Sequence, residues 1–448
     1  MEKIFVDKVY YSEKENVNSE ETKKINYVIR EIQSISDYLR AIESILSNYY
    51  IIMDNPIMKS FENLFSLEEK KNRLKELITE GIFFRGQSEE FDFIIPSIYR
   101  DINYIKNENN MIKEAEISYP LEIGKAKSQI DKLALMQHYG LPTRILDITT
   151  NALVALYFAV SGSNDKDGIV YLFNRKKREK ILNSRNTSVI VKIALSKLSF
   201  DEKLELHCIL EKKNKKNRNL LEETKKLDVF KKLYNNIKAD FGFLPNDIEC
   251  SDFYGLNFVY PQEIDERIIK QSAMFMIFGL DGFCDFDEKV SKFIKNNDEI
   301  NKKIKSFEEL KKYYEGQKAE ILGLDYNYSE EEIDNKKEEL NQIKKDIEKI
   351  EKEKQNREKE LKKYIIEKEI KSAIDKLINE CMIMYSPGHL PNEEEKWIFN
   401  DAQGKAVIVL KAKYKQRIKN ELELIGITRK SIYPDIQNKS QYIREKYL

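Results

Sequence analysis

The sequence contains few of the residues and runs that build metal sites, disulfide frameworks or membrane anchors. Its 448 residues include four cysteines and three histidines, and these show no CxxC or Cys/His ligand spacing, so a metal site is not indicated. The first residues, MEKIFVDKVYY, lack the apolar core of a signal peptide. The apolar run Ala152–Val160 has nine residues, whereas about 20 are needed to cross a bilayer. We therefore expect a reduced, soluble, cytoplasmic protein that holds no metal and enters no membrane.

Neither the charge nor the common catalytic motifs indicate a familiar class of enzyme. The chain carries 77 basic and 77 acidic residues, so no overall field favours nucleic acid or an anionic membrane, although a local basic groove is compatible with this balance. No Walker loop, GxSxG, HExxH or GxGxxG occurs, which leaves hydrolase, zinc-protease and Rossmann functions without motif support. The hydrophobic content of 41% allows a large core, and the length allows two to three domains.

The least charged part of the chain is Leu133–Val160, LALMQHYGLPTRILDITTNALVALYFAV, and it predicts the centre of the fold. Apolar residues at near-helical spacing end at Gly140, where a left-handed C-cap is favoured. The polar residues 143–147 predict a tight connector. A second, buried helix is then expected over 152–160, with Thr149, Thr150 or Asn151 as its N-cap.

Six polar residues are embedded in this apolar stretch, and each is costly to bury unless it is paired: Gln137, His138, Tyr139, Thr143, Arg144 and Asp147. One interpretation is a structural network in which Arg144 and Asp147 form a desolvated ion pair. The other is that these residues form the wall of a binding site. Residue types alone leave both interpretations open.

A second candidate for a site is the segment IFFRGQ, which follows Gly81. Its apolar residues predict a buried strand that delivers Arg85, Gly86 and Gln87. An arginine there presents a planar set of donors suited to phosphate or carboxylate, and the glycine would let a ligand approach the backbone. The alternative is a surface arginine followed by a turn glycine. Pro96 and Ser97 then predict the start of a helix.

Hydrophobic periodicity predicts the other elements. Helices are expected over 25–50 and 66–80, and over 111–131 with a break near Pro120. Residues 107–110 predict a polar loop. Strands are expected near the N-terminus, over 169–174 and 189–195, and in a segment that ends near Gly279.

The motifs in these segments match a known family. They are FFRGQ at 83–87, IIPSIYR at 94–100, LALMQHYGLPTRILD at 133–147, NALVALYFA from Asn151, a P…RIIKQSAMF segment at 261–275, and IKNELELIGITRKSIYPDI from Ile418. By these ordered motifs the chain resembles FRG domain proteins. Ile148 stands where an aromatic residue is usual, and Ala273 stands where glycine is usual.

Because the resemblance places the last motif at the end of the same domain, residues 287–377 look like an insertion. Their 3/4 apolar spacing amid dense Lys and Glu predicts an antiparallel coiled-coil hairpin; a lone solvated helix is the alternative. The predicted organisation is an N-terminal segment at 1–24, an FRG domain in two parts at 25–286 and 378–448, and the inserted hairpin, which could bind a protein partner or a second copy. We expect the hairpin to be an independent protrusion.

The strand-borne Arg85 followed by glycine is also similar to the first motif of the ADP-ribosyltransferases. That resemblance implies an α+β fold with a mixed or antiparallel sheet, NAD as substrate, and transferase or glycohydrolase activity as an intracellular effector. The position most like the glutamate of that superfamily holds Arg267. The candidate catalytic residues are His138, Asp147 and Glu266, and the candidate substrate-binding residues are Arg85, Gly86, Gln87, Tyr139, Arg144, Arg267 and Gln271.

Two further functions fit the same residues. The first is a nucleotide or nucleic-acid binding module without catalysis, in which arginines hold phosphates and Phe84 or Tyr139 stacks on a base. The second is an assembly protein that acts through its hairpin. In either nucleotide-binding function, Arg85, His138 and Gln271 are expected to share one polar pocket, because a shared wet cavity relieves the cost of burying each separately.

Overall fold

The structure is a computed structural model of the chain. It describes residues 6–11, 24–29, 32–54, 81–89, 93–162, 164–174, 181–212, 224–261, 266–295, 305–309, 311–313, 315–316, 330–385 and 404–433. The helix expected over 66–80 lies outside these residues. No helix in the described part is long and apolar enough to span a membrane.

The described strands form one sheet. They are β1 (Val6–Tyr11), β2 (Lys24–Ile29), β3 (Ile82–Gln87), β4 (Ile145–Thr149), β5 (Gly168–Asn174), β6 (Leu256–Val259), β7 (Ala273–Phe278), β8 (Met384–Tyr385) and β9 (Gly404–Leu410). Their order is β1-β2-β9-β5-β3-β4-β7-β6, and β8 pairs with β9. The pair β2–β9 is parallel and the other pairs are antiparallel. With the helices around it, this mixed sheet confirms the predicted α+β class.

The helices follow in chain order. They are α1 (Ile35–Asp54), η2 (Ser97–Arg100), α3 (Ile102–Ser118), α4 (Pro120–Ile123), α5 (Gln129–His138), α6 (Ala152–Val160), α7 (Thr187–Leu195), α8 (Phe200–Lys212), α10 (Asp228–Phe241), η3 (Cys250–Phe253), α11 (Glu266–Lys270), α12 (Phe286–Lys295), α14 (Glu330–Cys381), α15 (Ala412–Leu424) and α16 (Arg429–Ile432). η2 and η3 are 3₁₀ helices.

Both helices of the central stretch form as predicted. After α5, Gly140 adopts a left-handed conformation with φ +89°, and the Leu141 N–H donates to the Met136 carbonyl at 3.0 Å. These are features of a Schellman-type helix end. At α6, the Asn151 side chain accepts hydrogen bonds from the N–H groups of Leu153 and Val154, so Asn151 is the N-cap.

Several sequence-based predictions of local structure are wrong. The expected connector 143–147 instead leads into β4, a strand inside the sheet between β3 and β7. The expected strand 189–195 belongs to α7, whose residues 189–195 are all buried, and a helix buried on all sides has the same continuous apolar run as a buried strand. The expected helix 25–50 is divided between β2 and α1. The expected polar loop 107–110 lies within α3.

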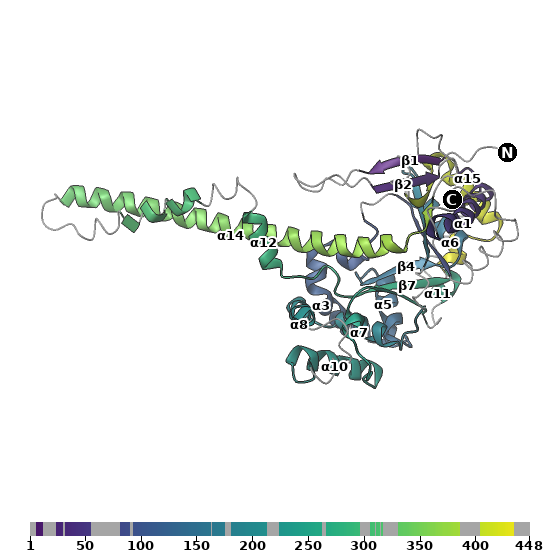
Figure 1. The fold of residues 1–448 in the computed structure, drawn as a ribbon, viewed down its shortest axis with the longest axis horizontal. Helices are drawn as coiled ribbons and strands as arrows, with labels where there is room; N and C mark the ends of the chain where they lie inside the picture. The colour runs from purple at the N-terminus through teal and green to yellow at the C-terminus, as the bar shows by residue number, and fades with distance from the viewer. Residues whose placement is uncertain are drawn as a thin grey trace.

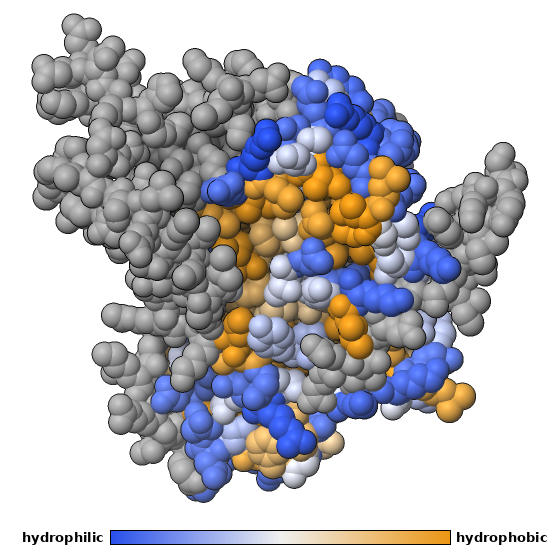
Figure 2. All heavy atoms as spheres, turned by 90° about the vertical axis from the view of Figure 1, so that its right-hand side faces the viewer, coloured by the Kyte–Doolittle hydropathy of each residue, from blue (hydrophilic) through white to orange (hydrophobic). Residues whose placement is uncertain are grey.

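Helices cover both faces of the sheet (Figure 1). Because successive side chains of a strand point to opposite faces, the neighbours Phe83 and Phe84 belong to different cores. Phe84 packs with residues of α1, α6 and α15. Phe83 packs with residues of η2, α3, α7, α10 and the C-terminal part of α14. Figure 2 views the end of the molecule where Figure 1 labels α1, α6 and α15, and shows apolar residues bordered by hydrophilic ones.

Two glycines let α6 lie unusually close to the sheet. A Cβ atom on Gly86 in β3 would lie 1.8 Å from the carbonyl oxygen of Ala155, and one on Gly168 in β5 would lie 2.1 Å from that of Ala159. Both distances are shorter than any non-bonded contact. The glycine of the FFRGQ motif is therefore required for helix–sheet packing, and α6, rather than a ligand, covers its backbone.

The long helix α14 extends far beyond the body of the protein and also enters its core (Figure 1). Ile366, Ile370, Ile374 and Ile378 are fully buried in the core that contains Phe83. Farther out, Lys311 pairs with Glu351 at 3.1 Å, so a second segment contacts this part of the helix. The domain boundaries and the coiled-coil hairpin stay predictions. The structure does show that the segment 365–377 contributes Ile365, Ile366, Ile370 and Ile374 to the core, so an independent protrusion cannot contain this segment.

Candidate functional site

The candidate site lies where β3 and β4 separate. β3 pairs with β5 along its whole length, from Ile82↔Asn174 to Gln87↔Ile169. In contrast, β3 pairs with β4 at one position, Phe84↔Thr149. Beyond that pair, the Arg85 side chain donates from Nη1 to the main-chain carbonyl of Asp147 at 2.5 Å. Arg85 thus makes the next link between the two strands in place of a main-chain ladder.

The guanidinium of Arg85 has an N–H donor that makes no hydrogen bond within the described residues. Its Nε is buried and has no hydrogen-bond partner, and none of the ion pairs found among the described residues includes Arg85. Burial lowers the pKa of Arg85; the Asp147 carboxylate opposes this shift, and the charge of Arg100 adds to it. An arginine nevertheless stays protonated in a protein. The positive charge of Arg85 is therefore only partly neutralised by the protein, and an anionic ligand would neutralise the rest.

Gln87 lies two residues along β3 from Arg85 and hence on the same face of the sheet. It is buried, and its Oε1 atom has no hydrogen-bond partner. A carboxamide offers both a donor and an acceptor. One strand face therefore presents a guanidinium and a carboxamide side by side, each with unused hydrogen-bonding capacity.

Asp147 is the exposed residue of an otherwise buried strand. Its carboxylate accepts a hydrogen bond from Nε2 of Gln137, and Oε1 of Gln137 accepts one from the Thr143 hydroxyl at 2.7 Å. These bonds attach the last turn of α5 to β4. Asp147 is consequently held at two points, its carboxylate by Gln137 and its main-chain carbonyl by Arg85.

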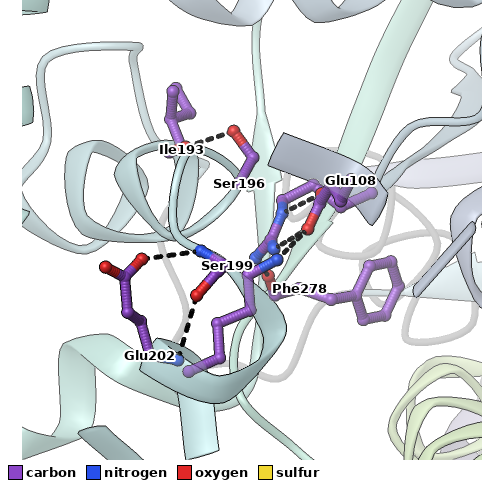
Figure 3. Close-up of polar contacts among 8 residues, drawn as sticks. Glu108, Ile193, Ser196, Ser199, Glu202 and Phe278 are labelled. Carbon is purple, nitrogen blue, oxygen red and sulfur yellow. Dashed lines mark hydrogen bonds and ion pairs between the residues drawn. The ribbon is translucent and has the colours of Figure 1, made fainter. Parts of the chain in front are cut away.

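The expected ion pair between Arg144 and Asp147 is wrong. Arg144 is buried, with a relative exposure of 2%, and its Nε and Nη2 donate to the two carboxylate oxygens of Glu108 at 2.7 and 2.5 Å. Its Nη1 donates to the Phe278 carbonyl at 3.2 Å, and Lys203 donates to Glu108 at 2.6 Å. Figure 3 shows Glu108 and Phe278 at this network. Positions 144 and 147 are an odd number of residues apart at the start of a strand, which directs their side chains to opposite faces.

The two cations of this network stabilise the ionised form of Glu108. Burial alone would raise the pKa of the Glu108 carboxyl, but the charges and hydrogen bonds of Arg144 and Lys203 outweigh that effect and lower the pKa to about 2. Sequence reasoning missed Glu108 and Lys203. A signal was present for Glu108, since it follows Ile105 by three residues and precedes Ile112 by four, which places it on the apolar face of α3.

The remaining predicted residues have other surroundings. Nε2 of Gln271 donates to the Ile432 carbonyl at 3.1 Å, which attaches the segment before β7 to α16. His138 ends α5 and stacks against Tyr139. Glu266 and Arg267 lie in α11, and their side chains are outside the described part of the chain. The structure thus gathers Arg85, Gln87 and Asp147, while the pocket shared by Arg85, His138 and Gln271 stays a prediction.

A metal site does not form among the described residues, where no three His, Cys, Asp or Glu side chains are grouped suitably to hold an ion. None of the cysteines at positions 208, 250, 284 and 381, all of them described residues, forms a disulfide. The groups available for chemistry at the candidate site are consequently one guanidinium, one carboxamide and one carboxylate.

Comparison with known proteins identifies one region of the chain. No curated protein and no solved structure matches the sequence. The family model of the FRG domain matches residues 80–168, a region that contains β3, β4, α6 and the site at Arg85. The motifs at 261–275 and from Ile418 lie outside the match. Residues 80–168 of this chain therefore form an FRG domain.

Proposed function

We propose that the chain binds a phosphorylated nucleotide, with Arg85 as the anchor for the phosphate. The observation that supports this most is the state of Arg85: its Nε is buried without a partner, and none of the ion pairs found among the described residues includes it. A phosphate oxygen would accept from this donor and compensate the charge. Arginine suits this role because its planar donors match phosphate geometry.

The surroundings of Arg85 favour a ligand that is more than an inorganic anion. The charge of Arg100 acts on Arg85 and strengthens the positive field, while the buried Oε1 of Gln87 requires a hydrogen-bond donor. A nucleotide has both kinds of group, because its hydroxyl and amino groups donate and its phosphates are anionic. NAD is the leading candidate, since the resemblance of the strand-borne Arg85 to the ADP-ribosyltransferases supports it independently.

The position of Asp147 favours a second candidate, cleavage of the bound NAD. Asp147 is the exposed residue of β4, its carboxylate is held by Gln137, and its charge acts on Arg85, so it could stabilise positive charge on the ribose. In such a reaction the bond between ribose C1′ and the nicotinamide nitrogen breaks, and nicotinamide leaves with the bonding electrons. Water or an acceptor group then bonds to C1′ and releases its proton. Loss of nicotinamide release in Asp147→Asn, with NAD binding retained, would support this candidate.

The binding proposal is tested by titration calorimetry of the full chain with NAD, ADP-ribose, ATP and inorganic phosphate. We expect Arg85→Ala to lose detectable binding of the nucleotides. The matched control is Arg417→Ala, because Arg417 is an exposed arginine paired with Glu421 in its own helix, and this variant should bind as the wild type does. Unchanged nucleotide binding in Arg85→Ala, or no binding by the wild-type protein, would refute the proposal.

A further inference from the structure

Three aromatic side chains form a row at the end of α5, directly after the residue that contacts Asp147. Tyr119 stacks on Tyr139 with ring centroids 6.5 Å apart and planes inclined by 23°, and Tyr139 stacks on His138 at 5.4 Å and 21°. Tyr119 is 51% exposed and Tyr139 is 55% exposed. We call Tyr119, Tyr139 and His138 the aromatic row.

The rings of the aromatic row overlap only in part. Atoms of stacked rings touch at about 3.5–4 Å, so centroids 5.4 and 6.5 Å apart in nearly parallel planes must be displaced sideways. The rings are arranged like steps, and each leaves part of its face uncovered. The high exposure of both tyrosines agrees with this arrangement.

The main chain at both tyrosines of the aromatic row is hydrogen-bonded to the preceding helix. Tyr119 lies between α3 and α4, and its N–H donates to the Ala115 carbonyl at 2.9 Å. Tyr139 follows α5, and its N–H donates to the Leu135 carbonyl at 3.1 Å. Exposed flat surfaces on a rigid backbone are suited to binding, because little conformational entropy is lost when a ligand stacks on them.

The aromatic row is connected to Arg85 through two hydrogen bonds. His138 and Tyr139 directly follow Gln137, whose amide holds the Asp147 carboxylate, and the Asp147 carbonyl accepts from Arg85. A ligand with a flat ring at one end and a phosphate at the other therefore has both of its partners on adjoining elements. We propose that the aromatic row is the nucleobase subsite for the nucleotide anchored by Arg85, an inference that rests on the function proposed above.

The charges around the aromatic row favour a single nucleotide over a nucleic-acid strand. Residues 113–132, which include Tyr119 and lead into α5, contain four lysines and four acidic residues and so carry no net charge. A strand needs a run of positive charge along its backbone. A mononucleotide or dinucleotide needs only the local positive charge at Arg85, with stacking to hold its base.

The inference is tested by titrating the full chain with AMP, NAD, ribose 5-phosphate and a single-stranded decanucleotide. Loss of a base stack typically weakens binding by about tenfold. We expect that loss for AMP and NAD in Tyr139→Ala and a smaller one in Tyr119→Ala. Tyr139→Phe, which keeps the ring, should bind within about twofold of wild type. Ribose 5-phosphate, which has no base, should bind equally to wild type and Tyr139→Ala. Thermal melts verify that the variants are folded.

The outcomes separate this inference from the proposed function. If Arg85→Ala loses AMP while Tyr139→Ala binds it as tightly as wild type, the phosphate anchor stands and the base subsite is refuted. If wild type binds neither AMP nor NAD, the proposed function fails and the subsite fails with it. If the decanucleotide binds more tightly than AMP, and its binding depends on Tyr139 but not on Arg85, the aromatic row serves a nucleic-acid strand and the nucleotide subsite is refuted.

Discussion

Two arginines of the FRG domain have opposite surroundings. Arg144 donates to both oxygens of a buried carboxylate and to a main-chain carbonyl, so its hydrogen-bonding groups serve the fold. Arg85 donates to one main-chain carbonyl and keeps a buried Nε without a partner. An arginine paired with a buried carboxylate serves the structure, whereas an arginine without such a partner is available to a ligand. The motif alone does not distinguish the two, because the carboxylate lies elsewhere in the chain.

The largest expected effect is the loss of the carboxylate that Arg144 and Lys203 share. Glu108→Gln would leave two buried cations without an anion, and we expect it to lower the free energy of unfolding by about 3–5 kcal/mol. Chemical denaturation measures this change. Glu114→Gln, at an exposed position of the same helix, should change stability by less than about 0.5 kcal/mol. A cost below about 1 kcal/mol for Glu108→Gln would mean that Arg144 is not held as described.

A comparable effect is expected beside Arg85, on the opposite face of β3. Gly86→Ala would place a methyl group within 1.8 Å of the Ala155 carbonyl, and forced separation of α6 from the sheet should cost about 3 kcal/mol. Gly140→Ala provides the control, since space is open around Gly140 and only its positive φ opposes a side chain; about 1 kcal/mol is expected. Equal melting temperatures for the two variants would contradict this account.

Acid should lower the free energy of unfolding gradually, by weakening the network of Glu108, Arg144 and Lys203. The pKa of Glu108 is lowered from 4.5 to about 2 in the folded protein, so the stability it contributes is present above pH 4.5 and is lost as the pH falls from 4.5 toward 2. The measurement is the unfolding free energy between pH 5 and 2. A triple variant, Glu108→Leu with Arg144→Met and Lys203→Met, replaces the network by apolar groups and should show a shallower slope. Identical slopes would exclude Glu108 as a contributor.

The smallest effect on stability is expected at Arg85. Within the described part of the fold its side chain donates one hydrogen bond, to the Asp147 carbonyl, and a single such bond contributes about 1 kcal/mol. Arg85→Ala should therefore melt within a few degrees of wild type while it loses nucleotide binding. If Arg85→Ala unfolds as readily as Glu108→Gln, the two arginines do not differ and Arg85 is a structural clasp.

Local signals in the sequence predicted the elements that depend on local chemistry. The strand at 82–87, the end of α5 at Gly140 and a cap among Thr149, Thr150 and Asn151 follow from apolar runs and from capping residues; the structure contains all three, with Asn151 as the cap. The α7 and β4 segments were mistaken because their class is decided by tertiary contacts. Continuous burial hides helical periodicity in α7, and the polar Arg144 and Asp147 mask a strand that is central in the sheet.

The residues of the candidate site could be predicted from the sequence, but the residues that they contact could not. Arg85, Gln87 and Asp147 were recognised because polar residues in apolar segments are costly to bury. The partner of Arg144 is Glu108, 36 residues away in sequence, and no spacing rule connects α3 to the start of β4. Likewise, the role of Gly86 depends on Ala155, which becomes its neighbour only when α6 folds back on β3.

The place of β9 in the sheet has a consequence for how the protein is made. β9 lies between β2 and β5, and β7 flanks β4, so both sides of the group formed by β5, β3 and β4 are completed by residues that the ribosome delivers later. Roughly 240 residues separate Gly168 from Gly404, and at about 5–20 residues per second their synthesis takes on the order of 10–50 seconds. During that time β5 has an unpaired edge, which is the kind of surface that chaperones shield and that drives aggregation. Pairing in the sheet at β5 is thus completed only after β9 has been synthesised.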